Sequence, residues 1–143
     1  MNTRESIIAA LFAALPGASS GVLTKSRTLK HWDDVLESEQ PALFLVQESE
    51  DAIPQTGLPT KWMLKLSVYL YTKTPNTDLP PMQAMNNLMD TLTAALARDN
   101  LTRGTYTIGG LVEWCRIDGQ IAQDGGALGT LCVSIVPLAI LTV

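Results

Sequence analysis

The sequence predicts a single α+β domain over residues 1–143: a mixed, mostly antiparallel sheet of four to five strands, with two main helices packed on one face and extended loops. The segment 61–73, KWMLKLSVYLYTK, alternates strictly between two kinds of side chain, which is typical of a strand with one dry and one wet face. Residues 82–98 place apolar side chains at three- and four-residue spacing, which is typical of an amphipathic helix. The 143 residues, 46% of them hydrophobic and 17% charged, are enough to bury one core.

A first helix is expected near the start of the sequence, because its apolar side chains also follow helical spacing: Ile7, Ile8, Leu11, Phe12 and Leu15. Pro16 and Gly17 should end it. A short secretion signal would also be apolar, but Glu5 offsets the charge of Arg4, so we expect a folded helix. The run is too short to cross a bilayer, which takes roughly 20 residues.

One compact strand is expected between this helix and the long strand. Residues 17–30 are small and polar and indicate a loop or a short edge strand. Residues 31–41, HWDDVLESEQP, favour one or two helical turns before Pro41 ends them. Residues 42–47, ALFLVQ, form the apolar strand. Residues 48–60, ESEDAIPQTGLPT, are acidic and rich in turn residues, so we interpret them as a long loop that acts as an arm or flap.

The long strand 61–73 would extend roughly 40 Å at about 3.3 Å per residue, well beyond a typical strand. It can therefore serve the core at one end and reach past the domain at the other. Amphipathic and basic side chains interleave on its wet face: Lys61, Met63, Lys65, Tyr69 and Tyr71. Such a face either lies under a helix or makes a protein–protein contact.

A turn with three prolines is expected at residues 74–81, and a turn-rich connector at residues 99–110. Between them, the apolar stripe of the second helix is rich in methionine. Core packing is its expected role, with a plastic binding surface as the alternative.

The C-terminal third predicts a β-hairpin, for which two arrangements are open. Asp118-Gly119 is a good two-residue turn, but it would leave a middle strand of only four residues. We favour one long hairpin with Gly119 as a bend or bulge and Pro137 at an edge or irregularity. Its arms would be residues 111–123 and 127–140, and its turn residues 124–126.

Composition excludes some function classes. The formal net charge of −4 and a pI near 4.8 argue against non-specific nucleic-acid binding, which needs a basic surface. Cys115 and Cys132 lie in apolar runs and are expected to be buried thiols, with a disulfide between facing strands as the alternative. No residues have metal-ligand spacing, and the glycines form no phosphate loop, so we expect no cofactor.

Candidate catalytic residues are sparse. His31 is the only histidine, and no serine or cysteine near it has the context of an activated nucleophile, so we expect a structural or surface residue. The clustered carboxylates are expected to form a solvated face, with a weak cation site as the alternative. They are Asp33, Asp34, Glu37, Glu39, Glu48, Glu50 and Asp51. We therefore expect that the chain is not an enzyme.

Three stretches together resemble small tail proteins of long-tailed and contractile-tailed bacteriophages: residues 26–47, the strand 61–73 and residues 111–143. They are similar to the tail terminator, or tail completion, family typified by the lambda minor tail protein U. The similarity covers roughly residues 5–142 and depends on element order, length and recurrent phrases.

The resemblance implies a virion structural protein without catalytic residues. It implies a homohexameric ring on the last ring of tail-tube protein, where it halts polymerisation, and a second face that docks the head-completion protein. The alternative for the free protein is a monomer in solution that assembles only on the tail tip. DNA would pass through this ring without being specifically bound, and no membrane is involved. The protein would be made in the host cytoplasm and lie at the head-proximal end of the tail.

We expect the subunit interface to combine the wet face of the long strand, the 48–60 loop and the 27–32 segment. The candidate residues are Arg27, Lys30, Trp32, Glu48, Asp51, Lys61, Lys65 and Tyr69. Three alternatives remain open: another head–tail connector or neck subunit, a small cytosolic ligand-binding protein, and a small enzyme using His31 with Asp33 or Asp34.

Overall fold

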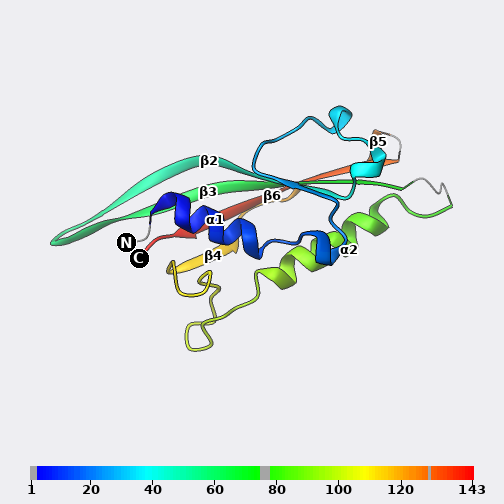
Figure 1. Cartoon of the computed structure of the whole chain (residues 1–143). Helices are drawn as coiled ribbons and strands as arrows, with labels where there is room; N and C mark the ends of the chain where they lie inside the picture. The colour runs from blue at the N-terminus through cyan, green and yellow to red at the C-terminus, as the bar shows by residue number, and fades with distance from the viewer. Residues whose placement is uncertain (1–2, 75–77, 129) are drawn as a thin grey trace.

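A computed structural model describes residues 3–74, 78–128 and 130–143, and this part of the chain forms one six-stranded sheet and two α-helices (Figure 1). The elements follow in the order α1 (Arg4–Ala14), β1 (Thr24–Ser26), β2 (Ala42–Gln55), β3 (Leu58–Lys73), α2 (Met82–Ala95), β4 (Trp114–Ile117), β5 (Ala122–Leu128) and β6 (Leu131–Leu141). Single 3-10 turns occupy Ala18–Ser20, Trp32–Asp34 and Glu37–Glu39. The predicted α+β class is confirmed, with one or two more strands than expected.

The sheet has the strand order β1-β2-β3-β6-β4, and β5 also pairs with β6. Only the β1–β2 pair is parallel among the described strands, so the sheet is mixed and mostly antiparallel, as predicted. One side of β6 pairs with β3 from Met63↔Leu141 to Lys73↔Leu131, and the other side pairs with β5 and then β4. The last strand in the sequence therefore lies in the middle of the sheet.

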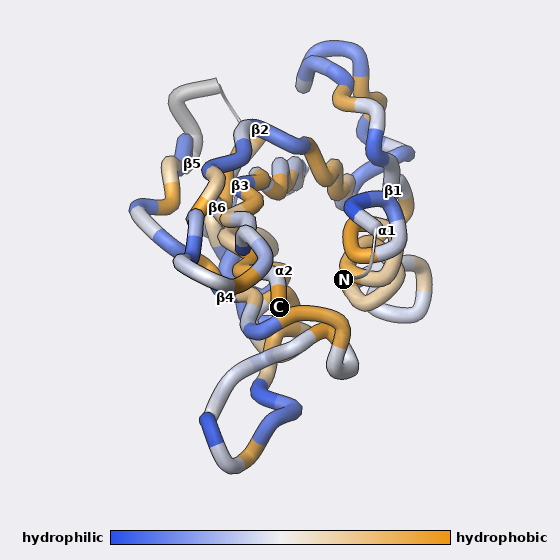
Figure 2. Tube along the Cα trace, turned by 90° about the vertical axis from the view of Figure 1, so that its left-hand side faces the viewer, coloured by the Kyte–Doolittle hydropathy of each residue, from blue (hydrophilic) through white to orange (hydrophobic). Residues whose placement is uncertain are grey.

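Both helices cover the same face of the sheet. Alternate residues of β3, from Leu64 to Leu70, enter the main core together with residues of α1 and α2. The buried helix residues are Ile7, Ile8 and Leu11 of α1 and Met85, Leu88 and Leu92 of α2. Figure 1 shows the two helices on one side of the strands, and the view along the molecule in Figure 2 shows α1 beside the sheet. The predicted amphipathic stripes are core stripes.

The opposite face of β3 is wet only along part of its length, which corrects the predicted wet face. Tyr71 is 2% exposed and packs in a second cluster with Phe44, Val35 and Val133. Trp32 and Tyr69 are partly buried at the margin of the same cluster. The segment that covers this face contains the 3-10 turns and lies far upstream in the sequence. Tyr71 bonds to the carbonyl of Lys30, which is 41 residues earlier. Alternation within the strand cannot reveal such a distant cover.

The segment 48–60 is not a loop, contrary to the prediction. It is the outer part of the β2–β3 hairpin, which stays paired from Ala42↔Tyr71 to Gln55↔Leu58. The hairpin turns at Thr56 and Gly57, and the φ angle of Gly57 is 74°. Pro54 and Pro59 are tolerated because they lie at the register irregularity next to Gln55, where ladder bonds are interrupted. Hairpin pairing therefore overrides local residues that usually interrupt strands.

The C-terminal hairpin is long, as favoured, but its turn is misplaced in the prediction. The strand β5 continues to Leu128 and β6 begins at Leu131, while residues 124–128 hold a register irregularity in place of the predicted turn. Pro137 lies opposite the gap between β4 and β5, where its carbonyl accepts a hydrogen bond from the Asp118 N–H. The missing N–H of Pro137 faces the same gap, so no ladder bond is lost.

The two cysteines are free and buried, as predicted. Cys132 belongs to β6, whereas Cys115 is paired with Ile140, eight residues further along that strand, or about 26 Å at the usual rise. A disulfide between them is therefore excluded by geometry. In the described part of the chain, no helix is long and apolar enough to span a membrane.

Candidate subunit interface

The outer part of the β2–β3 hairpin, residues 48–60, projects from the body of the molecule, and we call it the arm. In Figure 1 it extends past the other elements at the left. Pairing with β6 ends at Met63, so β3 continues for about 15 Å beyond its last contact with that strand. The arm contributes no buried residue, and Leu58 near its end is 64% exposed. An extended, exposed hairpin of this kind is suited to contact another protein.

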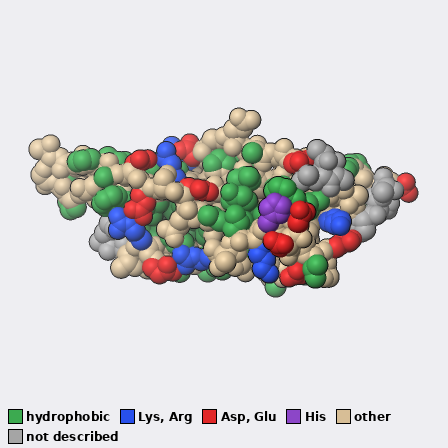
Figure 3. All heavy atoms as spheres, turned by 90° about the horizontal axis from the view of Figure 1, so that it is seen from above, with side chains coloured by type: hydrophobic (Ala, Val, Ile, Leu, Met, Phe, Trp, Pro, Cys, Tyr) green, Lys and Arg blue, Asp and Glu red, His purple; other side chains and the backbone are tan. Residues whose placement is uncertain are grey.

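The end of the arm is uncharged. Residues 52–60 read AIPQTGLPT, whereas Glu48, Glu50 and Asp51 lie nearer the body. Figure 3 shows this end, at the left, as green and tan spheres, with red and blue spheres beginning further in. The arm therefore combines an apolar end with an acidic base.

Ion pairs within the chain hold the base of the arm. Glu50 accepts two hydrogen bonds from Arg4 Nε, at 2.8 and 2.9 Å, and the Arg4 guanidinium lies 4.6 Å from the centre of the Trp62 ring. Across the two strands, Lys65 Nζ lies 3.5 Å from Asp51 Oδ2. These contacts tie α1 to the hairpin and fix the direction in which the arm leaves the body.

Two further predicted interface residues also pair within the chain. Lys61 forms an ion pair with Glu113, which in turn lies 3.5 Å from Arg103. Arg27 binds both carboxylate oxygens of Glu5 through Nη1 and Nη2. This hydrogen-bonded pairing lowers the pKa of Glu5 and raises that of Arg27. Both residues remain candidates, but each already has a partner.

The structure separates the eight predicted residues into two groups. Glu48, Asp51, Lys61 and Lys65 lie on the arm or at its base, and Arg27 joins them because its Nη2 lies 3.4 Å from Gln47 Oε1. Lys30, Trp32 and Tyr69 lie with the second cluster, where the Lys30 carbonyl accepts a hydrogen bond from Tyr71. The arm with Arg27, and the group of Lys30, Trp32 and Tyr69, therefore form two surfaces.

The region around His31 has no catalytic arrangement among the described residues. The exposed imidazole stacks on Trp32, with ring centres 3.8 Å apart, and its Nδ1 accepts the Asp33 N–H at 3.2 Å. No group of three or more possible metal ligands occurs in the described part of the chain. Several of the clustered carboxylates contact other groups: Glu39 caps Leu36, Glu37 lies 3.9 Å from Lys73, and Glu50 and Asp51 hold the arm.

The sequence prediction missed a pocket of about 350 Å³ between the end of α2 and β4. Its walls are Thr93, Leu96, Arg98, Gly104, Thr105, Tyr106, Trp114, Cys115, Arg116 and Ile117. Burial raises the pKa of the Cys115 thiol to about 12, so this thiol stays protonated and unreactive. Trp114 and Arg116 are two residues apart and so lie on one face of β4, which was the available signal for a surface site. No local pattern in the sequence links β4 to the end of α2.

The comparisons with known proteins identify no family. No protein-family model matches the chain, and no curated protein matches it.

Proposed function

We propose that the chain is a structural subunit of a bacteriophage tail, which caps the tail tube as a ring, ends its polymerisation and offers the head-joining surface. The observation that carries the proposal is the exposed arm, formed by strands of 14 and 16 residues in a chain of 143. A strand has a mean length of about 5–6 residues in globular proteins, so these two extend well beyond what a core of this size requires.

The molecule also has the asymmetry that a ring needs. In a head-to-tail ring, each subunit uses two different patches, and the ring closes when the rotation between neighbours divides a full turn. The arm is one such patch, and the body carries the other. The resemblance to tail terminators suggests six subunits, with the DNA passing through a lumen whose walls do not hold it. The net charge of −4 suits such a lumen.

The test is deletion of the gene in a phage that encodes this chain, followed by electron microscopy of the tails. Overlong tails without heads are the expected result, because an uncapped tube continues to polymerise. Tails of normal length that fail to join heads would assign the chain to a connector or neck instead. Normal, infectious particles would contradict any role in tail completion.

The pocket at β4 favours a second candidate, a ligand-binding protein. Its volume of about 350 Å³ lies at the lower end of the range for small-molecule sites, about 300–1,000 Å³. Native mass spectrometry of the purified protein separates the two functions. A stoichiometric bound metabolite would favour the ligand-binding protein, and oligomers of the bare chain would favour the ring.

A further inference from the structure

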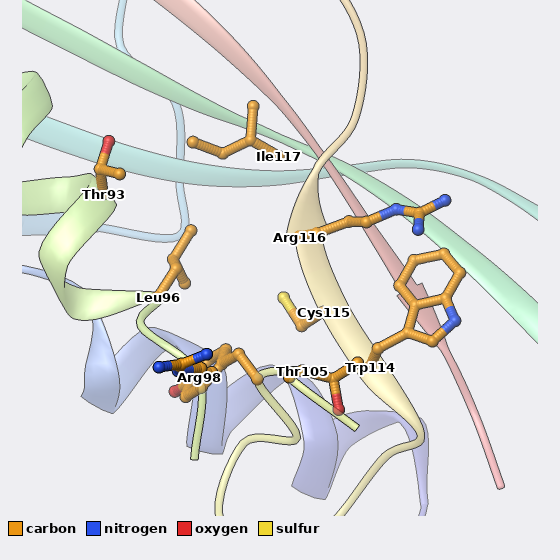
Figure 4. A pocket seen from close by; sticks show the side chains of 10 residues that line it. Thr93, Leu96, Arg98, Thr105, Trp114, Cys115, Arg116 and Ile117 are labelled. Carbon is orange, nitrogen blue, oxygen red and sulfur yellow. The ribbon is translucent and has the colours of Figure 1, made fainter. Parts of the chain in front are cut away.

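The pocket between α2 and β4 combines an apolar floor with a basic rim. Leu96, Tyr106, Trp114 and Ile117 supply apolar and aromatic surface, and all four are partly exposed. Arg98 follows the end of α2 and Arg116 extends from β4. Figure 4 shows Cys115 and Ile117 on the side of β4 toward Leu96, and Arg116 beside Trp114 on the other side of the strand. An occupant therefore needs an apolar body that also carries acceptors for arginine.

The two arginines lack acidic partners within the described residues. Arg116 stacks on Trp114, with its guanidinium carbon 3.9 Å from the ring centre, and makes no ion pair. Arg98 also makes none, because its neighbour Asp99 instead accepts hydrogen bonds from Thr107 and Gly109. The other basic groups near β4, the partly buried Lys61 and the exposed Arg103, share Glu113. Exposed arginines without ion-pair partners, beside partly exposed aromatic rings, are typical of protein interfaces.

The arm has the complementary chemistry. Leu58 is exposed at its end between prolines, and no charge occurs in residues 52–60. The outer edges of the arm have no strand partner in the described part of the chain, because β1 covers only Ala42–Phe44 of β2 and β6 begins to pair at Met63. Backbone carbonyls along these edges are acceptors for arginine. Behind the end, Glu50 and Asp51 already pair with Arg4 and Lys65, so the backbone acceptors of the arm are the groups left for arginine.

We propose that the arm of one copy docks at the α2–β4 pocket of a second copy, with Leu58 against Leu96 and Tyr106 and backbone acceptors of the arm on Arg98. This inference rests on the proposed ring and names its joint. An arm cannot enter the pocket of its own chain, since β2 and β3 stay paired to Gln55↔Leu58 and the arm points away from α2 and β4 (Figure 1). The contact therefore joins two different patches head to tail.

Two variants and a mixture test the joint. Leu58→Asp damages the arm and Arg98→Glu damages the pocket, and both residues are exposed, so the fold is retained. Leu36→Asp is the matched control, because Leu36 is also 64% exposed and directly precedes the 3-10 turn Glu37–Glu39, outside the arm. Analytical ultracentrifugation over a concentration series is expected to show association weakened at least about tenfold in each single variant, as for a central interface residue, and unchanged in the control.

The mixture of Leu58→Asp and Arg98→Glu separates a head-to-tail joint from other modes. Arg98→Glu leaves the arm intact and Leu58→Asp leaves the pocket intact. The mixture is therefore expected to form heterodimers but no larger oligomers. Three results would contradict the joint. In the first, both variants associate as strongly as the wild type. In the other two, the mixture forms no heterodimer, or the wild-type chain stays monomeric at every concentration. If the joint is overturned but the gene deletion gives overlong tails, the proposed ring function still stands. If the deletion gives tails of normal length, the ring function is wrong, whatever the association of the variants.

Discussion

The phenol of Tyr71 donates a hydrogen bond to the backbone carbonyl of Lys30 at 2.7 Å, across 41 residues of sequence. Tyr71 lies on β3, and Lys30 begins the segment that covers the second cluster of the sheet. The bond is partly buried and ties this segment to the strand at a point where it makes few other hydrogen bonds to the sheet.

Tyr71→Phe is expected to lower the free energy of unfolding by about 1–2 kcal/mol, because it leaves the Lys30 carbonyl without its donor. The measurement is urea denaturation followed by circular dichroism. Tyr69→Phe is the control, since Tyr69 packs at the margin of the same cluster and its change is expected to cost less than about 0.5 kcal/mol. Equal effects of the two changes would contradict the role of the bond.

Stability should fall at alkaline pH. Burial, with a contribution from Tyr69, raises the pKa of Tyr71 to about 12, and burial raises that of Cys115 to about 12. The folded state keeps protons that the unfolded state releases near its ordinary values of 9 for Cys115 and 10 for Tyr71, so the free energy of unfolding decreases from about pH 9 through pH 12. Denaturation curves at several pH values check this. Tyr71→Phe and Cys115→Ala should each make the decrease shallower, and an unchanged slope would argue against these groups.

Gly119→Ala is expected to destabilise the protein by about 1–2 kcal/mol, because φ at this residue is 122°, where an L side chain is strained. The added Cβ would also lie 3.4 Å from Pro137 Cγ, so the bend cannot relax freely toward β6. Gly17→Ala is the control: its φ is −140°, its Cβ would meet only the Lys25 side chain, and its cost should stay within about 0.5 kcal/mol. Thermal unfolding of the two variants decides the comparison.

Backbone amides of the arm should exchange with deuterium at least about tenfold faster than those of β3 between Leu64 and Leu70, because no buried side chain holds the arm. Hydrogen exchange with mass spectrometry at low protein concentration measures this. At concentrations that permit assembly, the arm should gain protection. Protection of the arm that is high and independent of concentration would contradict an open arm in the free subunit.

Charge reversal at two lysines separates folding from assembly. Lys65→Glu should change stability by less than about 0.5 kcal/mol, because its pair with Asp51 is exposed. Lys61→Glu should cost about 1–2 kcal/mol, since it places a carboxylate beside the half-buried Glu113. Ring formation by electron microscopy is then compared for the wild type and Lys65→Glu. Unchanged rings would remove this part of β3 from the subunit interface.

Much of the fold could be predicted because its signals are local. The alternation from Leu64 to Leu70 identified the strand and its buried face, and the spacing of Met85, Leu88 and Leu92 identified the core stripe of α2. The 48–60 segment was misread because Pro54 and Gly57 usually interrupt strands, whereas the hydrogen bonds that keep it extended come from pairing between its own halves.

The candidate surfaces were harder to predict, because their partners are distant in sequence. Arg27 and Lys61 are predicted interface residues, and their partners Glu5 and Glu113 approach them only in the folded chain. The pocket depends on the approach of the end of α2 to β4, which the path of the connector between them determines. No periodic pattern encodes that path.

The central position of β6 has a consequence for synthesis. On the ribosome, β2 and β3 emerge together and can pair as soon as both are out, since only Thr56 and Gly57 join them. The other edge of β3, with its run of apolar residues, stays unpaired until the final strand leaves the exit tunnel. The nascent chain therefore exposes an aggregation-prone edge from the emergence of β3 until the emergence of β6, and chaperones that shield such edges should raise the yield of folded protein.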